Sequence, residues 1–137
     1  MKSRHGSRKL AMQLLYQVVT RDEELDNFID SFVEQSDYEQ STKDFGIQLA
    51  ESMWQEKNKV DQLIKDFLIG WTLDRVSIVD LSILRLAFYE LLFLETPKNV
   101  VLNEAVELAK EFSSDESPKF INGILGKYVE SDVYRNR

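Results

Sequence analysis

The sequence has no cysteine, one histidine, two prolines and five glycines in 137 residues. Without cysteine, disulfide bonds, thiolate metal ligands and a cysteine nucleophile are excluded. The single histidine, His5, leaves no clustered set of histidine and carboxylate ligands for a metal ion. No glycine-rich turn stands between a strand pattern and a helix pattern, so a phosphate-binding loop is not expected. These absences predict a protein that is not an enzyme and needs neither metal nor cofactor.

Long hydrophobic runs are also missing. No apolar run approaches the about 18 to 20 residues that span a bilayer, and residues 1–9 lack the apolar centre of a signal peptide. We therefore expect a soluble, cytoplasmic protein without membrane contact. The length suits one domain, because a chain of this size buries roughly two thirds of the surface that its unfolded form exposes. A second folded domain is not expected.

Charge is distributed unevenly along the chain. The net charge is -7, yet residues 1–9 contain Lys2, Arg4, Arg8 and Lys9 and no acidic residue. Binding of a polyanion depends on the charge at the contact, so a basic arm can bind one while the acidic remainder faces another molecule. The distribution predicts two partners of opposite charge.

Helical periodicity runs through nearly the whole sequence. Apolar residues recur at i, i+3, i+4 and i+7, and no strand-like alternation competes with this pattern. The pattern predicts an all-α protein, with seven helices over about residues 10–19, 25–33, 41–54, 60–69, 78–94, 100–112 and 117–128. The fifth of these is apolar nearly all the way round, which is typical of a helix at the centre of a bundle.

Several residues mark expected helix ends. Ser41 with Asp44 fits a capping box at the start of the third helix, and Gly70 fits a C-terminal cap after the fourth. Pro97 is expected to end the fifth helix. Ser117 fits an N-cap before the proline that opens the seventh. Residues 55–59 are expected to interrupt the helical structure between the third and fourth helices. Residues 132–137 are expected to fray.

Three charged residues, Asp80, Arg85 and Glu90, lie in the most apolar helix. Steps of five residues turn the helix too far for the three to share a face, so each needs its own surroundings. A buried charge without a counter-ion is costly. We expect Arg85 to pair with a carboxylate such as Glu104 or Glu107 of the following helix. Asp80, near the start of its helix, suits either burial or an exposed position that faces a protein partner.

One candidate site lies on the outer face of the first helix. Lys9, Gln13 and Tyr16 project away from the leucine stripe, and His5 lies one turn earlier. Cationic and amide groups contact phosphates and base edges, and a tyrosine ring can stack on an unpaired base. The alternative is an ordinary solvated face next to a frayed terminus.

A second candidate site is the start of the seventh helix, with Lys119, Phe120 and Asn122. Amides at a helix N-terminus can bind a phosphate. The alternative places Phe120 in the core. Gly123 is unusual within the apolar stripe, because glycine costs about 1 kcal/mol in a helix interior. Close helix packing or the approach of a backbone would explain it.

Three blocks of sequence carry a family resemblance: Leu84–Glu90, Asn103–Lys110 and Phe120–Leu125. Each sets one or two polar side chains at fixed places in apolar helical sequence. In this order and spacing they resemble the NusB antitermination factors. The resemblance extends over Arg8, Ala11, Gln13, Leu15 and Tyr16 of the first helix and over Trp71 to Leu125, whereas residues 22–59 are nondescript.

The resemblance implies a bundle of seven helices in two small subdomains within a single domain, 1–137. Residues 1–9 are its basic arm, about 10–69 its N-terminal helices and about 71–131 its C-terminal helices. The implied function is transcription antitermination: binding boxA RNA of ribosomal RNA leader transcripts together with NusE, a small-subunit ribosomal protein. Other Nus factors and RNA polymerase are further implied partners. The complex is expected to help RNA polymerase read through terminators.

By position, the resemblance assigns RNA contacts to Lys2, Arg4, His5, Arg8, Lys9, Gln13, Tyr16, Lys119, Phe120 and Asn122. It assigns NusE contacts to Asp74 and Asp80, where acidic side chains suit a basic ribosomal protein.

Gly6 and Ser7 dilute the basic arm relative to the family, and no contact is assigned to Pro118 or Gly126. The alternative function is a non-catalytic interaction module, or a homodimer, that acts in ribosome assembly. The same fold also precedes the catalytic domain of some ribosomal RNA methyltransferases. This chain has no room for such a catalytic domain.

Overall fold

The computed structural model describes residues 3–137, so Lys2 lies outside the described residues. Over this range the chain is helical and contains no strand, as predicted. Its elements are α1 (Arg4–Arg21), a 3-10 turn η1 (Leu25–Asn27), α2 (Ile29–Glu34), α3 (Gln40–Gln55), α4 (Lys57–Phe67), a second 3-10 turn η2 (Leu73–Arg75), α5 (Ile78–Phe93), α6 (Lys98–Phe112), α7 (Ser117–Val129) and α8 (Asp132–Arg135). Eight α-helices are therefore described where seven were expected.

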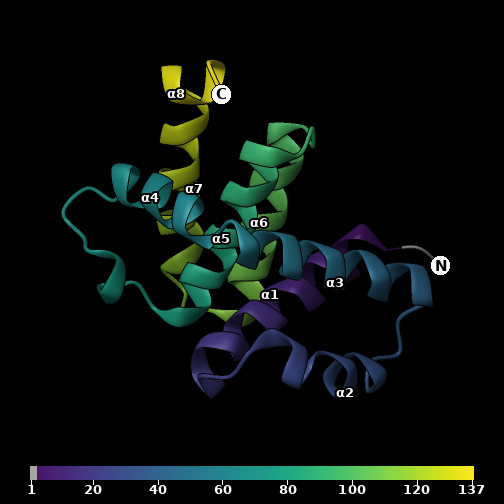
Figure 1. Ribbon diagram of the computed structural model, residues 1–137. Coiled ribbons are helices and arrows are strands. Elements are labelled where there is room, and N and C mark those ends of the chain that lie inside the picture. Colours follow the sequence, from purple (N-terminus) through teal and green to yellow (C-terminus); the bar gives the residue numbers. More distant parts are fainter. Residues whose placement is uncertain (1–2) are drawn as a thin grey trace. The chain divides into compact units, whose positions relative to one another are not determined.

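The chain divides into two compact units, an N-terminal unit (Met1–Gln55) and a C-terminal unit (Glu56–Arg137). Figure 1 shows their elements in sequence colours. The division falls between α3 and α4, so α4 belongs to the C-terminal unit. The sequence had grouped this helix with the N-terminal ones. The prediction had no basis for anticipating that α4 packs on α5.

In the N-terminal unit, α1 and α3 lie side by side (Figure 1). They approach each other closely at Gly46, where a Cβ atom would lie 3.0 Å from the Ser7 carbonyl oxygen and 3.1 Å from Leu10 Cδ2. The Ser7 hydroxyl donates to the Thr42 carbonyl oxygen at 2.8 Å. A residue without a side chain therefore sets the spacing of these two helices.

The first helix begins at Arg4, six residues earlier than expected. The Ser3 hydroxyl accepts from the Gly6 amide at 2.9 Å and caps the helix. The Ser3 amide donates to the Thr42 hydroxyl at 3.1 Å, which joins this start to α3. Residues 4–9 of the predicted basic arm are therefore the first turns of α1, and Ser3 is its N-cap.

The segment predicted as one helix over 25–33 is split. Phe28, with φ -131° and ψ -4°, separates η1 from α2. The predicted apolar face is nevertheless buried: its buried members are Leu25, Phe28, Ile29 and Val33. The capping box at Ser41 is also wrong, because α3 already begins at Gln40. The prediction therefore identified the buried residues of this segment correctly but not the points where its helices begin and end.

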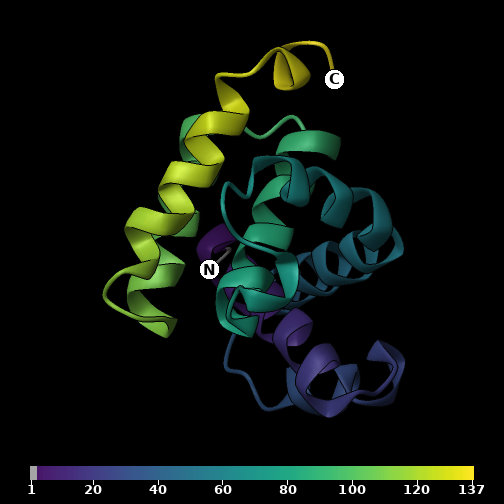
Figure 2. The ribbon, with the colours of Figure 1, turned by 90° about the vertical axis from the view of Figure 1, so that its left-hand side faces the viewer.

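The C-terminal unit is built around α5, on which α4, α6 and α7 pack. Residues 80–91 of α5 are all buried, which confirms the predicted central helix. Figure 2 shows α6 and α7 running alongside each other in green and yellow. The core of this unit therefore surrounds one helix.

Arg85 has a buried carboxylate partner, as expected, and one such partner is Asp61 of the preceding helix. The Arg85 Nε and Nη2 atoms donate to the two Asp61 carboxylate oxygens, each at 2.9 Å. The prediction had placed the carboxylate on the following helix, at Glu104 or Glu107. Asp61 lies within the helix predicted over residues 60–69, but the prediction considered only carboxylates of the following helix.

Several predicted boundaries shift by a few residues. The break between α3 and α4 is only Glu56. Gly70 has the left-handed φ of +77°, but α4 ends at Phe67, so Gly70 turns the following loop and does not cap the helix directly. Pro97 is the N-cap of α6, four residues after α5 ends. Ser117 is the first residue of α7, and Glu116 precedes it.

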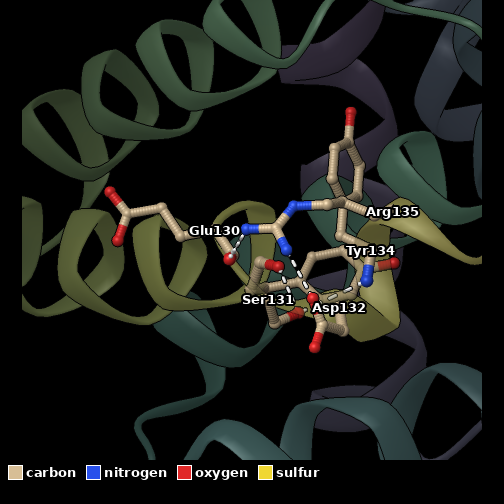
Figure 3. Close-up of polar contacts among 6 residues, drawn as sticks. Glu130, Ser131, Asp132, Tyr134 and Arg135 are labelled. Carbon is tan, nitrogen blue, oxygen red and sulfur yellow. Dashed lines mark hydrogen bonds and ion pairs between the residues drawn. The ribbon is translucent and has the colours of Figure 1, made fainter.

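The C-terminal tail forms α8, which corrects the expectation that it frays. The Ser131 hydroxyl caps α8 by accepting from the Tyr134 amide at 3.3 Å. Figure 3 shows the Arg135 guanidinium between the Asp132 carboxylate and the Glu130 carbonyl oxygen. Beyond α8, Arg137 Nε donates to the Leu91 carbonyl oxygen at 2.7 Å. Side-chain hydrogen bonds therefore order a segment for which the sequence pattern had predicted no ordered structure.

Candidate nucleic-acid interface

The outer face of α1 presents most of the side chains that the sequence singled out there. His5, Lys9 and Gln13 follow each other at four-residue steps, which places them in one row along the helix. Tyr16 lies at the far end of this row and is 37% exposed. His5 is exposed, and Lys9 and Gln13 are partly exposed. The row combines a cation, an amide and an aromatic ring on an accessible surface.

Arg4 and Arg8 differ although the sequence treats them alike. The Arg4 guanidinium lies 3.7 Å from the centre of the Phe45 ring and remains exposed. Arg8 is only 6% exposed, because it lies on the same face of α1 as the fully buried Ala11 and Leu15. Arg8 therefore offers little surface to a ligand, and Arg4 offers a guanidinium that is already oriented by an aromatic ring.

The start of α7 is held by a cluster of serine hydroxyls around Asp80. Ser113 and Ser117 each donate to one oxygen of the Asp80 carboxylate, at 2.6 and 2.9 Å. The Ser117 hydroxyl also lies 2.8 Å from those of Ser113 and Ser114. The Ser77 hydroxyl accepts from the Asp80 amide at 3.2 Å. This cluster joins the first turn of α5 to the first turn of α7, and so positions Lys119 and Phe120.

On α7 itself, Lys119 and Asn122 are exposed and Phe120 is half-buried. The Phe120 ring packs against the Trp71 ring, with centres 5.8 Å apart and planes at 60°. The helix terminus contributes little to phosphate binding, because Pro118 has no amide hydrogen and the Ser117 amide already donates to the Ser114 carbonyl oxygen. A phosphate here would depend mainly on lysine side chains.

A hollow of about 540 Å³ lies beside these rings, within the C-terminal unit. Its lining combines apolar and aromatic side chains with two lysines, one glutamate and one glycine: Phe67, Leu68, Ile69, Trp71, Glu116, Lys119, Phe120, Gly123, Ile124 and Lys127. A second hollow, of about 530 Å³, shares Trp71, Glu116 and Phe120 with the first and extends to Arg75 and the serine cluster.

The two acidic residues assigned to a protein partner lie in different surroundings. Asp74 is exposed within η2. Asp80 is 8% exposed, and its carboxylate accepts the two serine hydrogen bonds described above. The alternative of an exposed Asp80 is therefore wrong, because its oxygens serve the junction of α5 and α7. Asp74 keeps a carboxylate available at the surface.

Sequence reasoning missed Trp71 as part of a site. Trp71 is 49% exposed and Ile69 is 71% exposed, both in the loop after α4. Their signal in the sequence was a pair of large apolar residues around Gly70, outside any helical stripe. Among the described residues, no group of three histidine, cysteine, aspartate or glutamate side chains is placed to hold a metal ion. No described helix is long and apolar enough to cross a membrane.

A sequence model of the NusB family matches residues 5–130. The chain belongs to the NusB family. Transcription antitermination protein NusB of Streptomyces avermitilis is 43% identical over 134 residues, covering 95% of this chain and 93% of that protein. The NusB protein of Acetivibrio thermocellus is 41% identical over 128 residues, covering 93% of this chain and 88% of that protein. The predicted family is therefore confirmed.

Solved NusB structures have the same fold. T. maritima NusB superposes with a TM-score of 0.84 at 32% identity, and the match covers 100% of both chains. A chain from the crystal structure of the antitermination factors NusB and NusE in complex with double-stranded RNA superposes with a TM-score of 0.84 at 25% identity. That match covers 98% of this chain and 97% of the other. The all-α NusB fold predicted from the sequence is confirmed.

Proposed function

We propose that this protein is a transcription antitermination factor that binds boxA RNA of ribosomal RNA leader transcripts together with NusE. In the cytoplasm, this complex with other Nus factors helps RNA polymerase to read through terminators. The observation that carries the proposal is membership of the NusB family over residues 5–130. A solved complex of a similar chain with NusE and RNA supports both partners. The role proposed is binding and not catalysis.

Two accessible surfaces support RNA binding. On α1 these are Arg4, His5, Lys9, Gln13 and Tyr16, and on α7 they are Lys119, Phe120 and Asn122. Lysine and arginine contact phosphates, and aromatic rings stack on unpaired bases, so both surfaces have the composition that reads single-stranded RNA. We assign Arg8 a minor share of this contact because it is 6% exposed. Lys2 belongs to the proposal on sequence grounds alone.

For NusE, we propose a surface that includes Asp74. An exposed carboxylate attracts a basic ribosomal protein and guides its approach. Asp80 acts indirectly in this proposal, because its carboxylate holds Ser113 and Ser117 in place. The net charge of -7 favours a basic protein partner in general.

The test is a binding titration with fluorescently labelled boxA RNA, followed by anisotropy with and without NusE. We expect NusE and RNA to bind cooperatively, each raising the affinity of the protein for the other. A boxA RNA with scrambled sequence serves as the control and should bind more weakly. Equal affinity for both RNAs and no effect of NusE would contradict the proposal and favour an interaction module without an RNA site.

Salt dependence tests the residues. For a single strand, the logarithm of the binding constant falls with the logarithm of salt concentration by about 0.7 per phosphate contacted. Arg4→Gln and Lys119→Gln should each reduce this slope by about 0.7. Lys98→Gln, which removes an exposed lysine at the start of α6, is the matched control and should leave the slope unchanged. Unchanged slopes in all three variants would remove both residues from the interface.

A further inference from the structure

The loop after α4 exposes two large apolar side chains, one on each side of Gly70 in the sequence. Trp71 is 49% exposed and Ile69 is 71% exposed. Exposed apolar groups that gather around a hollow mark binding sites on soluble proteins. Both residues line the hollow of about 540 Å³ described above, which lies within the range of about 300 to 1,000 Å³ that is usual for small-ligand sites.

Aromatic rings from two elements meet at this hollow. Trp71 comes from the loop and Phe120 from α7, with ring centres 5.8 Å apart. The Arg75 guanidinium lies 5.8 Å from the centre of the Trp71 ring. A flat ligand that enters the hollow therefore meets aromatic surface from both elements. Stacking on aromatic rings is the usual contact of unpaired bases with proteins.

Gly123 gives a second, independent indication. It lines the hollow from inside α7, where glycine costs about 1 kcal/mol relative to alanine. A Cβ atom added at Gly123 would meet no atom within 4 Å, so close packing of helices does not require the glycine. The open space above it lies in the hollow and is available to a group from outside the chain.

The charges around the hollow favour an anionic ligand. Lys119 and Lys127 are exposed and line it, and Glu116 is the one acidic residue among the lining. The lysines lie eight residues apart on α7, so they follow the same side of the helix at different heights. This arrangement suits a ligand with a flat apolar part and negatively charged groups on either side of it.

We propose that this hollow is a stacking site for one unpaired base of bound RNA. Trp71 and Phe120 contact the base, Lys119 and Lys127 neutralise the flanking phosphates, and Gly123 leaves room for the strand to pass close to α7. The inference rests on the proposed function and deepens it, because it adds Trp71, Gly123 and Lys127 to the RNA-binding residues.

Tryptophan fluorescence tests the site directly. The chain has two tryptophans, Trp54 and Trp71, so Trp54→Phe leaves Trp71 as the single reporter. Titration with single-stranded boxA RNA should change the Trp71 emission at the same RNA concentrations that change the anisotropy of labelled RNA. Trp71→Ala should weaken RNA binding about 5- to 150-fold, the usual range for loss of one stacking contact.

A pair of glycine variants separates filling of the hollow from other effects. Gly123→Leu places a side chain in the hollow, whereas Gly126→Leu adds one at another open position of α7 that does not line it. Both should raise the melting temperature, because leucine favours the helix more than glycine. Only Gly123→Leu should weaken RNA binding, and the melting temperatures show that each variant is folded.

The outcomes distinguish the stacking site from the proposed function. If RNA binds while Trp71 emission stays constant and Gly123→Leu binds with full affinity, the stacking site is refuted and the antitermination role stands. If no RNA binds with or without NusE, the proposed function fails and the stacking site with it. If NusE alone changes Trp71 emission and Gly123→Leu abolishes NusE binding, the hollow is a protein-docking site and the proposal is overturned.

Discussion

Asp80 is a buried carboxylate that accepts hydrogen bonds from serine hydroxyl groups. It accepts from Ser113 and Ser117, and the nearby Ser77 caps its helix. Hydrogen bonds to a charged acceptor contribute more than neutral ones, and removal of the acceptor leaves buried donors without a partner. The residue therefore couples the stability of the C-terminal unit to the geometry of the proposed RNA surface on α7.

Asp80→Ala should lower the free energy of unfolding by about 2 to 3 kcal/mol, because two charge-assisted hydrogen bonds are lost. Urea denaturation followed by circular dichroism measures this change. Asp74→Ala is the matched control, since Asp74 is exposed, and should change stability by less than about 0.5 kcal/mol. Equal losses in both variants would show that the serine cluster contributes nothing specific.

Tyr128 is fully buried, and its hydroxyl has no hydrogen-bond partner among the described residues. Burial raises the pKa of Tyr128 above its ordinary value of 10.0, with Arg137 lowering it in part and Tyr134 raising it. The unfolded chain then loses this proton at lower pH than the folded chain. The stability contribution of Tyr128 is therefore complete below about pH 10 and is lost as pH rises further.

Tyr128→Phe should abolish this alkaline loss while changing stability little at neutral pH, because an unpartnered hydroxyl contributes no hydrogen bond. Urea unfolding of both proteins at about pH 8 and about pH 11 measures the difference. A steeper alkaline loss in the Phe variant than in the parent protein would contradict the assignment.

Sequence patterns predicted the residues of the candidate site unevenly. Tyr16 was predicted from helical spacing, and Lys119 and Asn122 from their place at the start of the seventh helix; all three are exposed. Arg8 was assigned by position through the family resemblance, and its place on the face of Ala11 was not used. Trp71 was missed because loop residues follow no periodicity. Their exposure depends on tertiary packing.

At the scale of elements, α5 and the contact of α1 with α3 dominate the two units. The apolar circumference of α5 predicted its central place. The close approach at Gly46 was not predictable, because a glycine inside a helical pattern does not indicate which atoms lie above it. The predicted core faces are correct, whereas the helix ends differ, since ends depend on individual capping hydrogen bonds such as those of Ser3 and Ser131.

Gly46→Ala should destabilise the protein by about 1 to 3 kcal/mol, the usual cost of overpacking. Its new methyl group would lie 3.0 Å from a backbone oxygen of α1, and backbone atoms cannot rotate away. Thermal unfolding measures the loss, and Gly126→Ala, at an open position, should instead be neutral or stabilising. A stable Gly46→Ala protein would show that α1 and α3 can separate at little cost.

For the whole molecule, the net charge of -7 opposes binding of the proposed RNA partner and favours binding of the proposed basic protein partner. It opposes a polyanion at long range, so RNA binding depends on the local basic surfaces, and it attracts a basic protein. Composition predicted this division, because net charge requires no knowledge of the fold. Which acidic side chains face solvent was not predictable, as Asp74 and Asp80 show.

The association rate of the protein with NusE should fall as salt concentration rises, because screening weakens long-range attraction. Stopped-flow measurements between about 0.05 and about 0.5 M salt test this dependence. Asp74→Asn should slow association at low salt and have little effect at high salt. Asp66→Asn, which also removes an exposed carboxylate, is the control for a loss of charge elsewhere in the C-terminal unit. A rate that does not respond to salt would exclude electrostatic guidance.

The uninterrupted burial of residues 80–91 has a consequence for hydrogen exchange. Water reaches the amides of a helix enclosed on every side only when the surrounding helices come apart, so these amides exchange through the largest opening of the C-terminal unit. In deuterated solvent, the middle of α5 should keep its protons longest in this unit, and its exchange rate gives the free energy of that opening.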